Sequence, residues 1–187
     1  MSARSVPRAM TSQDRKARCI ERPSDGPRSS LWYWRHHAGF FRTAGRYVVI
    51  MLGRITPSFR LKNWMYRTIL RAKVDKHAAI GLEVTLDIFY PHMITIEEDA
   101  IVGFASTILC HEYAADWYRT GPVVIQRRAT IGANTTLLPG VIVGEGSVVS
   151  AMSLVNRDIP PGEMWGGVPV RRIRGADGKL ANEADAP

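Results

Sequence analysis

The stretch that decides the fold is residues 125–160, which read IQRRAT IGANTT LLPGVI VGEGSV VSAMSL VNRDIP when divided into sixes. The first position of every six is Ile, Leu or Val, and the fifth is mostly small or β-branched. A period of six residues is typical of a parallel β-helix, in which each six forms one short strand and one turn. Three sixes then make one triangular coil, with the first-position side chains stacked inside it.

The same register continues towards the N-terminus. It begins at Val74 and is interrupted at residues 92–95 and again at residues 114–124. The inward first positions are residues 74, 80, 86, 96, 102, 108, 125, 131, 137, 143, 149 and 155. We therefore predict a mainly β protein with about four coils over residues 74–175, from which residues 114–124 are extruded as a loop.

The C-terminal part of the repeat resembles a known family. Residues 131–174 read IGANTTLLPGVIVGEGSVVSAMSLVNRDIPPGEMWGGVPVRRIR, and the DIPP turn and the GGVPVRRIR tail are particularly telling. This segment is similar to the end of the hexapeptide-repeat acyltransferases, which include the maltose, galactoside and xenobiotic acetyltransferases. The resemblance covers residues 74–174. It implies a left-handed β-helix, an acetyl-CoA donor and a homotrimer with active sites between neighbouring subunits.

The N-terminal part differs from the repeat in charge. Residues 1–75 carry 16 Lys and Arg against 4 Asp and Glu, whereas residues 76–187 carry 9 against 13. Residues 1–30 contain few large apolar groups, so we predict a disordered basic tail there. We predict an N-terminal helical cap over residues 31–73 and a flexible tail over residues 176–187.

The cap should consist of two amphipathic helices, over residues 31–55 and 59–73. Apolar residues recur at steps of three and four in the first helix, at positions 34, 38, 41, 45, 48, 52 and 55, and Pro57 ends it. One hypothesis is that the helices cover the open end of the β-helix. Another is that residues 1–73 contact an anionic membrane surface from its inner face, and the two hypotheses are compatible.

Composition excludes several classes of protein. The two cysteines, Cys19 and Cys110, do not form a disulfide framework, which fits a reducing compartment. The N-terminus shows no apolar secretory core, and no apolar run is long enough to span a bilayer. No nucleic-acid recognition motif accompanies the basic charge. We therefore expect a cytoplasmic protein that binds no nucleic acid.

His111 is the candidate catalytic residue. It is the fourth residue of the six ILCHEY, so strand alternation points it outwards beside the extruded loop. Imidazole, with an ordinary pKa near 6.5, suits a general base that deprotonates an attacking hydroxyl. The catalytic His of the family occupies the corresponding place. Cys110 points inwards, so we assign it to the core rather than to a Cys–His dyad.

Four residues are candidates for binding the acceptor. Asp87 lies on the third face one coil below His111, where related sugar acetyltransferases have an Asn, and this difference leaves the acceptor open. Glu112 could orient His111 or bind the acceptor. Tyr113 and Trp117 border the loop and could stack on a sugar. We predict a hydroxyl of a sugar or glycan as acceptor, with transfer to an amine left open.

The resemblance also assigns residues to coenzyme A, namely Ala133, Ala151, Asn156, Arg157 and Arg174, and Arg172 adds to the same basic cluster. Small side chains at 133 and 151 leave the backbone accessible to the pantetheine arm. Arginine forks match phosphate oxygens. Trp165 could flank the adenine or fill a subunit contact.

Two other functions are alternatives to acetyl transfer. A non-catalytic trimeric scaffold would keep the repeat without needing both His111 and the arginines. A γ-type carbonic anhydrase has the same fold but needs three His on zinc. His77 starts on the first face and His111 on the third, so these two do not converge within one subunit, and we predict no metal.

Overall fold

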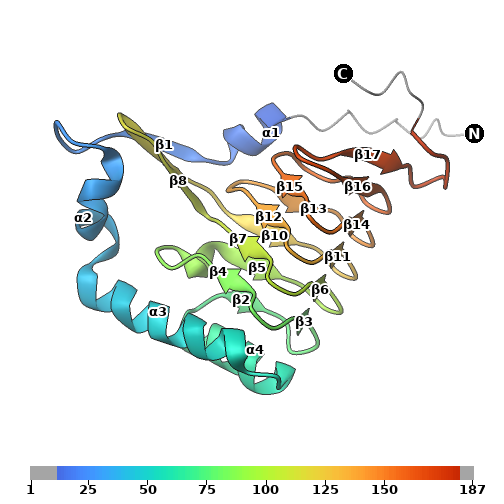
Figure 1. Ribbon diagram of the computed structural model, residues 1–187, viewed down its shortest axis with the longest axis horizontal. Coiled ribbons are helices and arrows are strands. Elements are labelled where there is room, and N and C mark those ends of the chain that lie inside the picture. The colour runs from blue at the N-terminus through green and yellow to red at the C-terminus, as the bar shows by residue number, and fades with distance from the viewer. Residues whose placement is uncertain (1–11, 182–187) are drawn as a thin grey trace, which may run out of the picture.

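The computed structural model describes residues 12–181 and shows a parallel β-helix of four complete coils (Figure 1). The first face consists of β2 (Lys73–Val74), β5 (Ile94–Ile96), β10 (Val123–Ile125) and β13 (Ile142–Val143). The second face begins with β3 (Ala79–Ile80), β6 (Ile101–Val102), β11 (Thr130–Ile131) and β14 (Val148–Val149). The third face consists of β4 (Thr85–Leu86), β7 (Thr107–Ile108), β12 (Thr136–Leu137) and β15 (Leu154–Val155).

The core is the column of first-position side chains. All twelve residues predicted to point inwards are at most 3% exposed. Their stacking follows the strand register, in which Ile80 pairs with Val102, Val102 with Ile131, and Ile131 with Val149. The predicted β-helix, its four coils and its three faces are therefore confirmed. Each buried aliphatic side chain contributes about 1.5–3 kcal/mol, so the column is the main source of stability.

Glycine in this repeat marks places where one coil approaches the next. A Cβ added to Gly132 would lie 2.3 Å from the backbone nitrogen of Ala151, so no side chain fits. Ser150 occupies the equivalent position one coil later. It fits because Gly166 lies next to it, where an added Cβ would come within 2.8 Å of the Ser150 Cβ. The repeat therefore tolerates Ser at this position only opposite a Gly.

The chain continues the second face after the fourth coil. Strand β16 (Met164–Gly166) pairs with β14 in parallel, and β17 (Arg171–Arg174) returns antiparallel to β16. The tail of residues 168–174 therefore folds back against the last coil. The sequence did not indicate β16, because its residues fall out of the six-residue register.

The extruded segment is a β-hairpin of β8 (His111–Tyr113) and β9 (Trp117–Thr120). It begins three residues before the predicted loop of residues 114–124, and it ends before β10 resumes the first face at Val123. His111 therefore lies on a hairpin strand that leaves the β-helix. Cys110, just before the hairpin, is fully buried in the core, as predicted.

The chain before residue 30 is packed against the body. Helix α1 (Ser12–Ala17) is followed by β1 (Ile20–Pro23), which pairs with β9 in a three-stranded sheet. We call residues 15–23 the strap. The buried Arg15 donates to the carbonyl of Pro139 at 2.8 Å, and Arg18 pairs with the buried carboxylate of Asp158.

The strap differs from the disordered tail predicted over residues 1–30. The segment is held by ion pairs and strand pairing rather than by apolar side chains, so its low hydrophobic content did not predict its order. Residues 1–11 of that tail, and residues 182–187 of the C-terminal tail, lie outside the described residues.

Helices cover the end of the β-helix at the first coil (Figure 1). They are α3 (Phe40–Ile55) and α4 (Phe59–Thr68), whereas η1 (Ser30–Tyr33) and α2 (Trp34–Ala38) lie beside the hairpin. The buried ammonium of Lys62 donates to the carbonyls of Ile80 and Gly81, and Asn63 donates to the carbonyl of Ala78. Helix α4 therefore satisfies backbone acceptors that the first coil leaves without a neighbouring strand.

The apolar stripe of α3 faces away from the β-helix. Phe41 is 87% exposed, and Val48, Leu52 and Ile55 are exposed as well. The side that packs inwards carries Thr43, Ile50 and Gly53, the last against Tyr66. The helix predicted over residues 31–55 is broken at Gly39, where φ is +72°, and only its part from Phe40 to Ile55 forms one continuous helix. Along α3, the apolar side expected to be buried is the outer one. Among residues 12–181, no helix is long and apolar enough to cross a membrane.

Candidate active site

The centre of the site is the pair of Asp87 and His111. Asp87 follows β4 in the first coil, and His111 begins β8 in the second, so stacking of the coils brings them together. The Asp87 Oδ2 and His111 Nδ1 atoms lie 2.5 Å apart. The Asp87 side chain is fully buried, whereas the His111 side chain is 18% exposed. The imidazole therefore has one nitrogen held from within and the other, Nε2, open to a ligand.

Asp87 is fixed as a carboxylate by its surroundings. Burial alone would raise the pKa of Asp87. The hydrogen bond and charge of His111 and the backbone N–H groups of Tyr90 and Cys110 outweigh burial, so the pKa lies below its ordinary value. Its Oδ1 accepts from the N–H groups of Phe89 and Tyr90, and its Oδ2 accepts from Cys110. A carboxylate at this position makes Nδ1 of His111 the protonated nitrogen. Nε2 then carries a lone pair and can accept a proton.

Aromatic rings surround the imidazole. The ring centroids of Phe89 and Tyr113 lie 4.9 and 5.2 Å from that of His111, and the ring of Tyr90 lies 6.3 Å away. Burial raises the pKa of Tyr90 and of Tyr113, so both hydroxyls stay protonated at neutral pH. The Tyr113 hydroxyl is buried and interacts with the Tyr90 hydroxyl.

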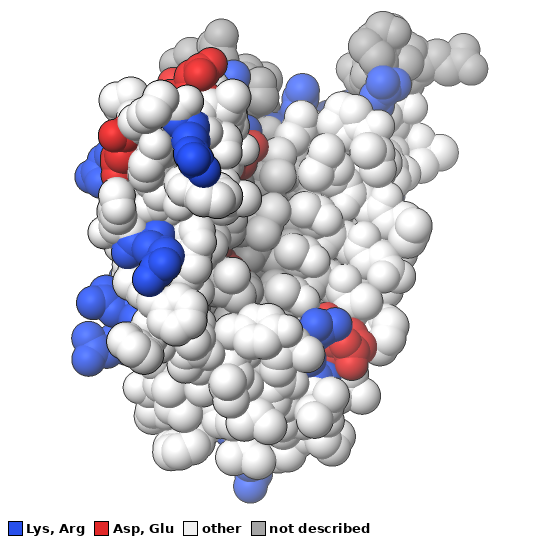
Figure 2. Space-filling view, turned by 60° about the vertical axis from the view of Figure 1, so that its left-hand side comes forward, with Lys and Arg blue, Asp and Glu red and all other residues white. Residues whose placement is uncertain are grey.

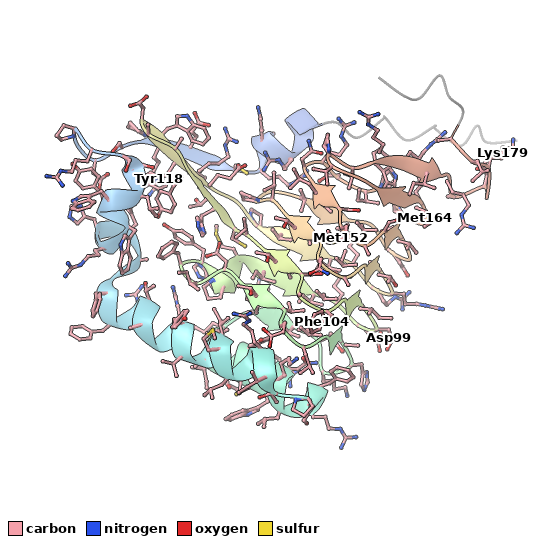
Figure 3. The ribbon with its side chains drawn as sticks, viewed as in Figure 1. Asp99, Phe104, Tyr118, Met152, Met164 and Lys179 are labelled. Carbon is pink, nitrogen blue, oxygen red and sulfur yellow. The ribbon has the colours of Figure 1, made fainter. Side chains whose placement is uncertain are left out.

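The N-terminal segment forms one wall of this site. The ring of Trp34 lies 5.5 Å from that of Phe89, and Arg46 of α3 donates to the Phe89 carbonyl. Tyr118, on the hairpin beside α2, lies against His37 with 4.5 Å between ring centroids (Figure 3). Phe89, Tyr90 and Trp34 were not predicted as site residues. The signal for Phe89 and Tyr90 was their position directly after Asp87.

Two predicted substrate residues lie apart from the imidazole. Glu112 points to the opposite side of β8, where its Oε2 accepts from Arg15 at 3.3 Å and Arg119 at 3.1 Å. Trp117 pairs with Pro23 at the far end of the hairpin and packs under the guanidinium of Arg119. Glu112 thus holds the strap to the hairpin. Of the four predicted substrate residues, the structure brings Asp87 and Tyr113 to His111.

The predicted coenzyme A residues fall into two groups. Ala133 and Ala151 lie one above the other at the corner between the second and third faces, where the Met152 N–H donates to the Ala133 carbonyl. Phe104 and Met152 belong to the same corner (Figure 3). Arg172 and Arg174 lie on β17 and are exposed. This first group could line a groove for an extended, phosphate-bearing molecule.

The second group is Asn156 and Arg157, which lie at the corner between the third and first faces, above His111 along the helix axis. The strap crosses this corner between the Asn156–Arg157 pair and His111, since Arg15 and Arg18 contact Pro139 and Gly140. The Oδ1 atom of Asn156 and the Nε atom of Arg157 are buried without a hydrogen-bond partner in the described chain. Buried polar atoms of this kind are normally paired, so a ligand or a further subunit is expected to meet them.

His111 and the Ala133–Ala151 corner lie at opposite edges of the third face. Two hollows of about 500 and 540 Å³ surround α2 and the start of α3, and neither is lined by His111. His111 and the predicted donor residues Ala133 and Ala151 therefore face different sides of one subunit. Trp165, on β16, donates its Nε1–H to Glu163 and packs on the core.

Of the other repeat histidines, His77 lies away from His111, whereas His92 lies near enough to Asp87 to interact with its charge. His77 lies at the corner between the first and second faces, near Asp75 and Glu98. His92 follows Tyr90, and burial together with the positive charge of Arg46 lowers its pKa. Within residues 12–181, no group of three or more His, Cys, Asp and Glu is placed to hold a metal ion.

Comparison with known sequences identifies the repeat. Residues 122–157 match the family model of the bacterial transferase hexapeptide, described as six repeats. YvoF of Bacillus subtilis (strain 168), which carries the name of an acetyltransferase, is 45% identical over 145 residues, covering 78% of this chain and 84% of the relative. SAR0816 of Staphylococcus aureus (strain MRSA252), also named as an acetyltransferase, is 36% identical over 130 residues, covering 70% and 81%.

Solved structures share the fold at low sequence identity. A hexapeptide-repeat acetyltransferase of Vibrio cholerae is 22% identical, covers 73% of this chain and 91% of its own, and has a TM-score of 0.60. The same enzyme has been solved in complex with acetyl-CoA, with a TM-score of 0.58. A maltose O-acetyltransferase of Clostridium difficile 630 is 18% identical, covers 76% and 88%, and has a TM-score of 0.58. By its sequence relatives and its left-handed β-helix, the chain belongs to the hexapeptide-repeat acetyltransferase family.

Proposed function

We propose that this protein transfers an acetyl group from acetyl-CoA to a hydroxyl of a sugar or glycan, with His111 as the general base. The observation that carries the proposal is the buried Asp87 carboxylate on Nδ1 of His111, which leaves Nε2 as a base at the surface. Nothing else among the described residues pairs an exposed imidazole with a fully buried carboxylate.

The reaction needs one proton acceptor. Nε2 of His111 takes the proton from the acceptor hydroxyl as its oxygen attacks the thioester carbonyl. The C–O bond forms and the C–S bond breaks, and the leaving sulfur receives the proton from Nε2. No acyl-enzyme is needed when both substrates are held together. Asp87 is a positioning residue, because it fixes the tautomer and balances the charge of the imidazolium.

We further propose that the donor binds between subunits of a homotrimer. The two corners that carry the predicted catalytic and donor residues face different directions within one chain. Joining the third–first corner of one subunit to the second–third corner of the next would bring them together, and rings of this kind are common oligomers. Ala133 and Ala151 would then contact the pantetheine arm. Arg157, Arg172 and Arg174 would contact the phosphates, with Asn156 beside them.

The acceptor would lie against the aromatic wall of the site. Phe89, Tyr90 and Tyr113 offer flat faces of the kind on which sugar rings pack. The maltose O-acetyltransferase among the solved structures is a precedent for the fold only. A cytoplasmic location would supply both acetyl-CoA and reduced thiols.

A thiol-release assay with acetyl-CoA tests this proposal. We expect release to depend on an acceptor from a panel of sugars and glycan precursors, and the product to carry one acetyl group on oxygen by mass spectrometry and alkaline lability. A panel of small amines is the comparison. Thiol release only with amines would show that the protein transfers acetyl groups to nitrogen rather than to oxygen. Absence of thiol release with every acceptor, from a protein that binds coenzyme A, would contradict the role of His111.

A further inference from the structure

The outward side of the helical cap is apolar over two helices. On α3 it consists of Phe40, Phe41, Tyr47, Val48, Leu52 and Ile55, and on α4 of Phe59, Leu61, Trp64, with Ile69 directly after it. About half or more of each of these side chains is exposed. We call this surface the α3–α4 face. An exposed apolar surface that extends over two helices is unusual for a soluble monomer and indicates a binding surface.

Cations border this face, and acidic residues are absent from it. No Asp or Glu occurs between Asp25 and Asp75 in the sequence, whereas Arg and Lys occur ten times in that interval. Several of these cations are exposed near the apolar side chains, namely Arg35, Arg42, Arg60, Arg67, Arg71 and Lys73. Figure 2 shows the α2 side of the molecule, with blue groups along its left flank and a largely white lower part.

The inward side of α3 explains why the apolar stripe stays outside. Arg54 pairs with Glu83 at 2.5 Å, and Arg46 donates to the Phe89 carbonyl, so polar contacts hold the helix to the β-helix. Ile50 and Gly53 fill the remaining contact. The helix is therefore fixed by its polar side, and its apolar side is left for another surface.

We propose that the α3–α4 face binds in the plane of a lipid bilayer that carries anionic headgroups. An amphipathic helix with Phe, Leu and Trp on one side and arginines at its flanks is suited to the interface between headgroups and acyl chains. A second copy of this chain is a poorer occupant, since docking two such faces would place arginines opposite arginines. Phe41 is 87% exposed, and a fluid bilayer accommodates a side chain that protrudes in this way. This inference does not depend on the proposed reaction.

Sedimentation with vesicles tests the inference on the full-length protein. We expect pelleting with vesicles of phosphatidylcholine mixed with phosphatidylglycerol, and much less with phosphatidylcholine alone. Binding should weaken as salt shortens the Debye length from about 10 Å at 0.1 M to about 3 Å at 1 M. Arg42→Gln and Arg60→Gln should each weaken binding about five-fold, the factor that corresponds to ~1 kcal/mol per surface cation.

The apolar part of the inference has its own variants. Phe41→Ser and Leu52→Ser should each weaken vesicle binding about ten-fold or more. Thermal unfolding should change little, because Phe41 is 87% exposed and Leu52 is half-exposed. Ile101→Ser is the matched control. Its side chain is 46% exposed, close to the 50% of Leu52, but it lies on β6 of the β-helix, away from the two corners of the proposed site. The control should pellet like the wild type.

Three results would overturn the inference. One is the absence of pelleting with anionic vesicles, or equal pelleting with both kinds of vesicle. Another is pelleting of the Phe41→Ser and Leu52→Ser variants to the same extent as wild type. The third is a smaller molar mass of these variants by light scattering, which would show that a second copy of the chain covers the face.

Discussion

Replacement of Asp87 by Asn tests the central pair with almost no change in shape. The carboxylate accepts four hydrogen bonds, from the N–H groups of Phe89, Tyr90 and Cys110 and from His111 Nδ1. An Asn can keep its carbonyl oxygen towards Phe89 and Tyr90. The Asn NH2 group, a donor, then faces two other donors, the Cys110 N–H and the His111 Nδ1–H. Both of these lose the acceptor that Asp87 Oδ2 provides.

The magnitude follows from these contacts. The buried Cys110 N–H loses its acceptor, and an unsatisfied buried donor costs about 1–3 kcal/mol of stability. The imidazole can avoid the clash by moving its proton to Nε2, so that Nδ1 accepts from Asn. This tautomer has no lone pair at the surface. We therefore expect turnover to fall about 10²–10⁴-fold, the usual contribution of a general base.

The assay combines steady-state kinetics with unfolding measurements. Asp87→Asn should lower kcat at saturating acetyl-CoA and leave the KM for acetyl-CoA near wild type, because the pair lies away from the donor corner. In the double variant with His111→Ala, Asp87→Asn should have no further effect on kcat. A merely structural Asp87 would give additive losses instead. Near wild-type kcat for Asp87→Asn would refute the positioning role.

Acid unfolding of the same variant gives an independent check. The folded-state pKa of Asp87 lies below its ordinary value of about 3.9, so its contribution to stability is complete above that value and is lost as pH falls below it. Wild type should therefore lose stability between about pH 4 and the lowered pKa. Asp87→Asn should be less stable at neutral pH and lose less on acidification. Parallel pH curves for the two proteins would contradict this.

His111→Ala should keep the fold and coenzyme A binding but lose about 10²–10⁴-fold in kcat, and calorimetry with coenzyme A separates binding from catalysis. Arg172→Ala and Arg174→Ala should raise the KM for acetyl-CoA more than they lower kcat, because phosphate contacts stabilise ground and transition states alike. If these arginines contact the 3′-phosphate, most of the increase in KM should vanish with a dephospho-coenzyme A thioester. An equal increase with that donor would show that Arg172 and Arg174 do not contact the 3′-phosphate. Arg18→Ala should cost about 2–3 kcal/mol in chemical denaturation, since it leaves the buried Asp158 without its cation, and a loss below about 0.5 kcal/mol would show that the strap contributes little.

The β-helix could be predicted because its information is local and repeated. Each six carries its own inward aliphatic residue, so the register of Val74 or Val155 can be assigned without knowing any distant contact. Asp87 was also within reach, since Leu86 pairs with Ile108 and the following residues of both coils must then lie near each other. Its role differed from the predicted one. It was expected to bind the acceptor, and it binds the imidazole.

The N-terminal part could not be predicted in the same way. The strap is held by ion pairs of Arg15 with Glu112 and of Arg18 with Asp158. The partners are about a hundred residues or more apart in the sequence, so no local pattern predicts them. For α3, periodicity predicted a helix but not the break at Gly39 that separates it from α2. Periodicity shows that a helix has an apolar side, but not which side meets the protein. That depends on the polar contacts of Arg46 and Arg54.

The strap also changes how the β-helix should unfold. A solenoid in which each coil contacts only its neighbours can fray coil by coil from either end. Here the N-terminal chain contacts the first coil through α4 and the fourth through Arg18, so the two ends of the stack are tied to one segment. Loss of the last coil therefore releases the strap as well, and we expect cooperativity across the whole domain. On the ribosome, this closure must wait until residue 158 has emerged, so the N-terminal segment is complete long before its partner exists.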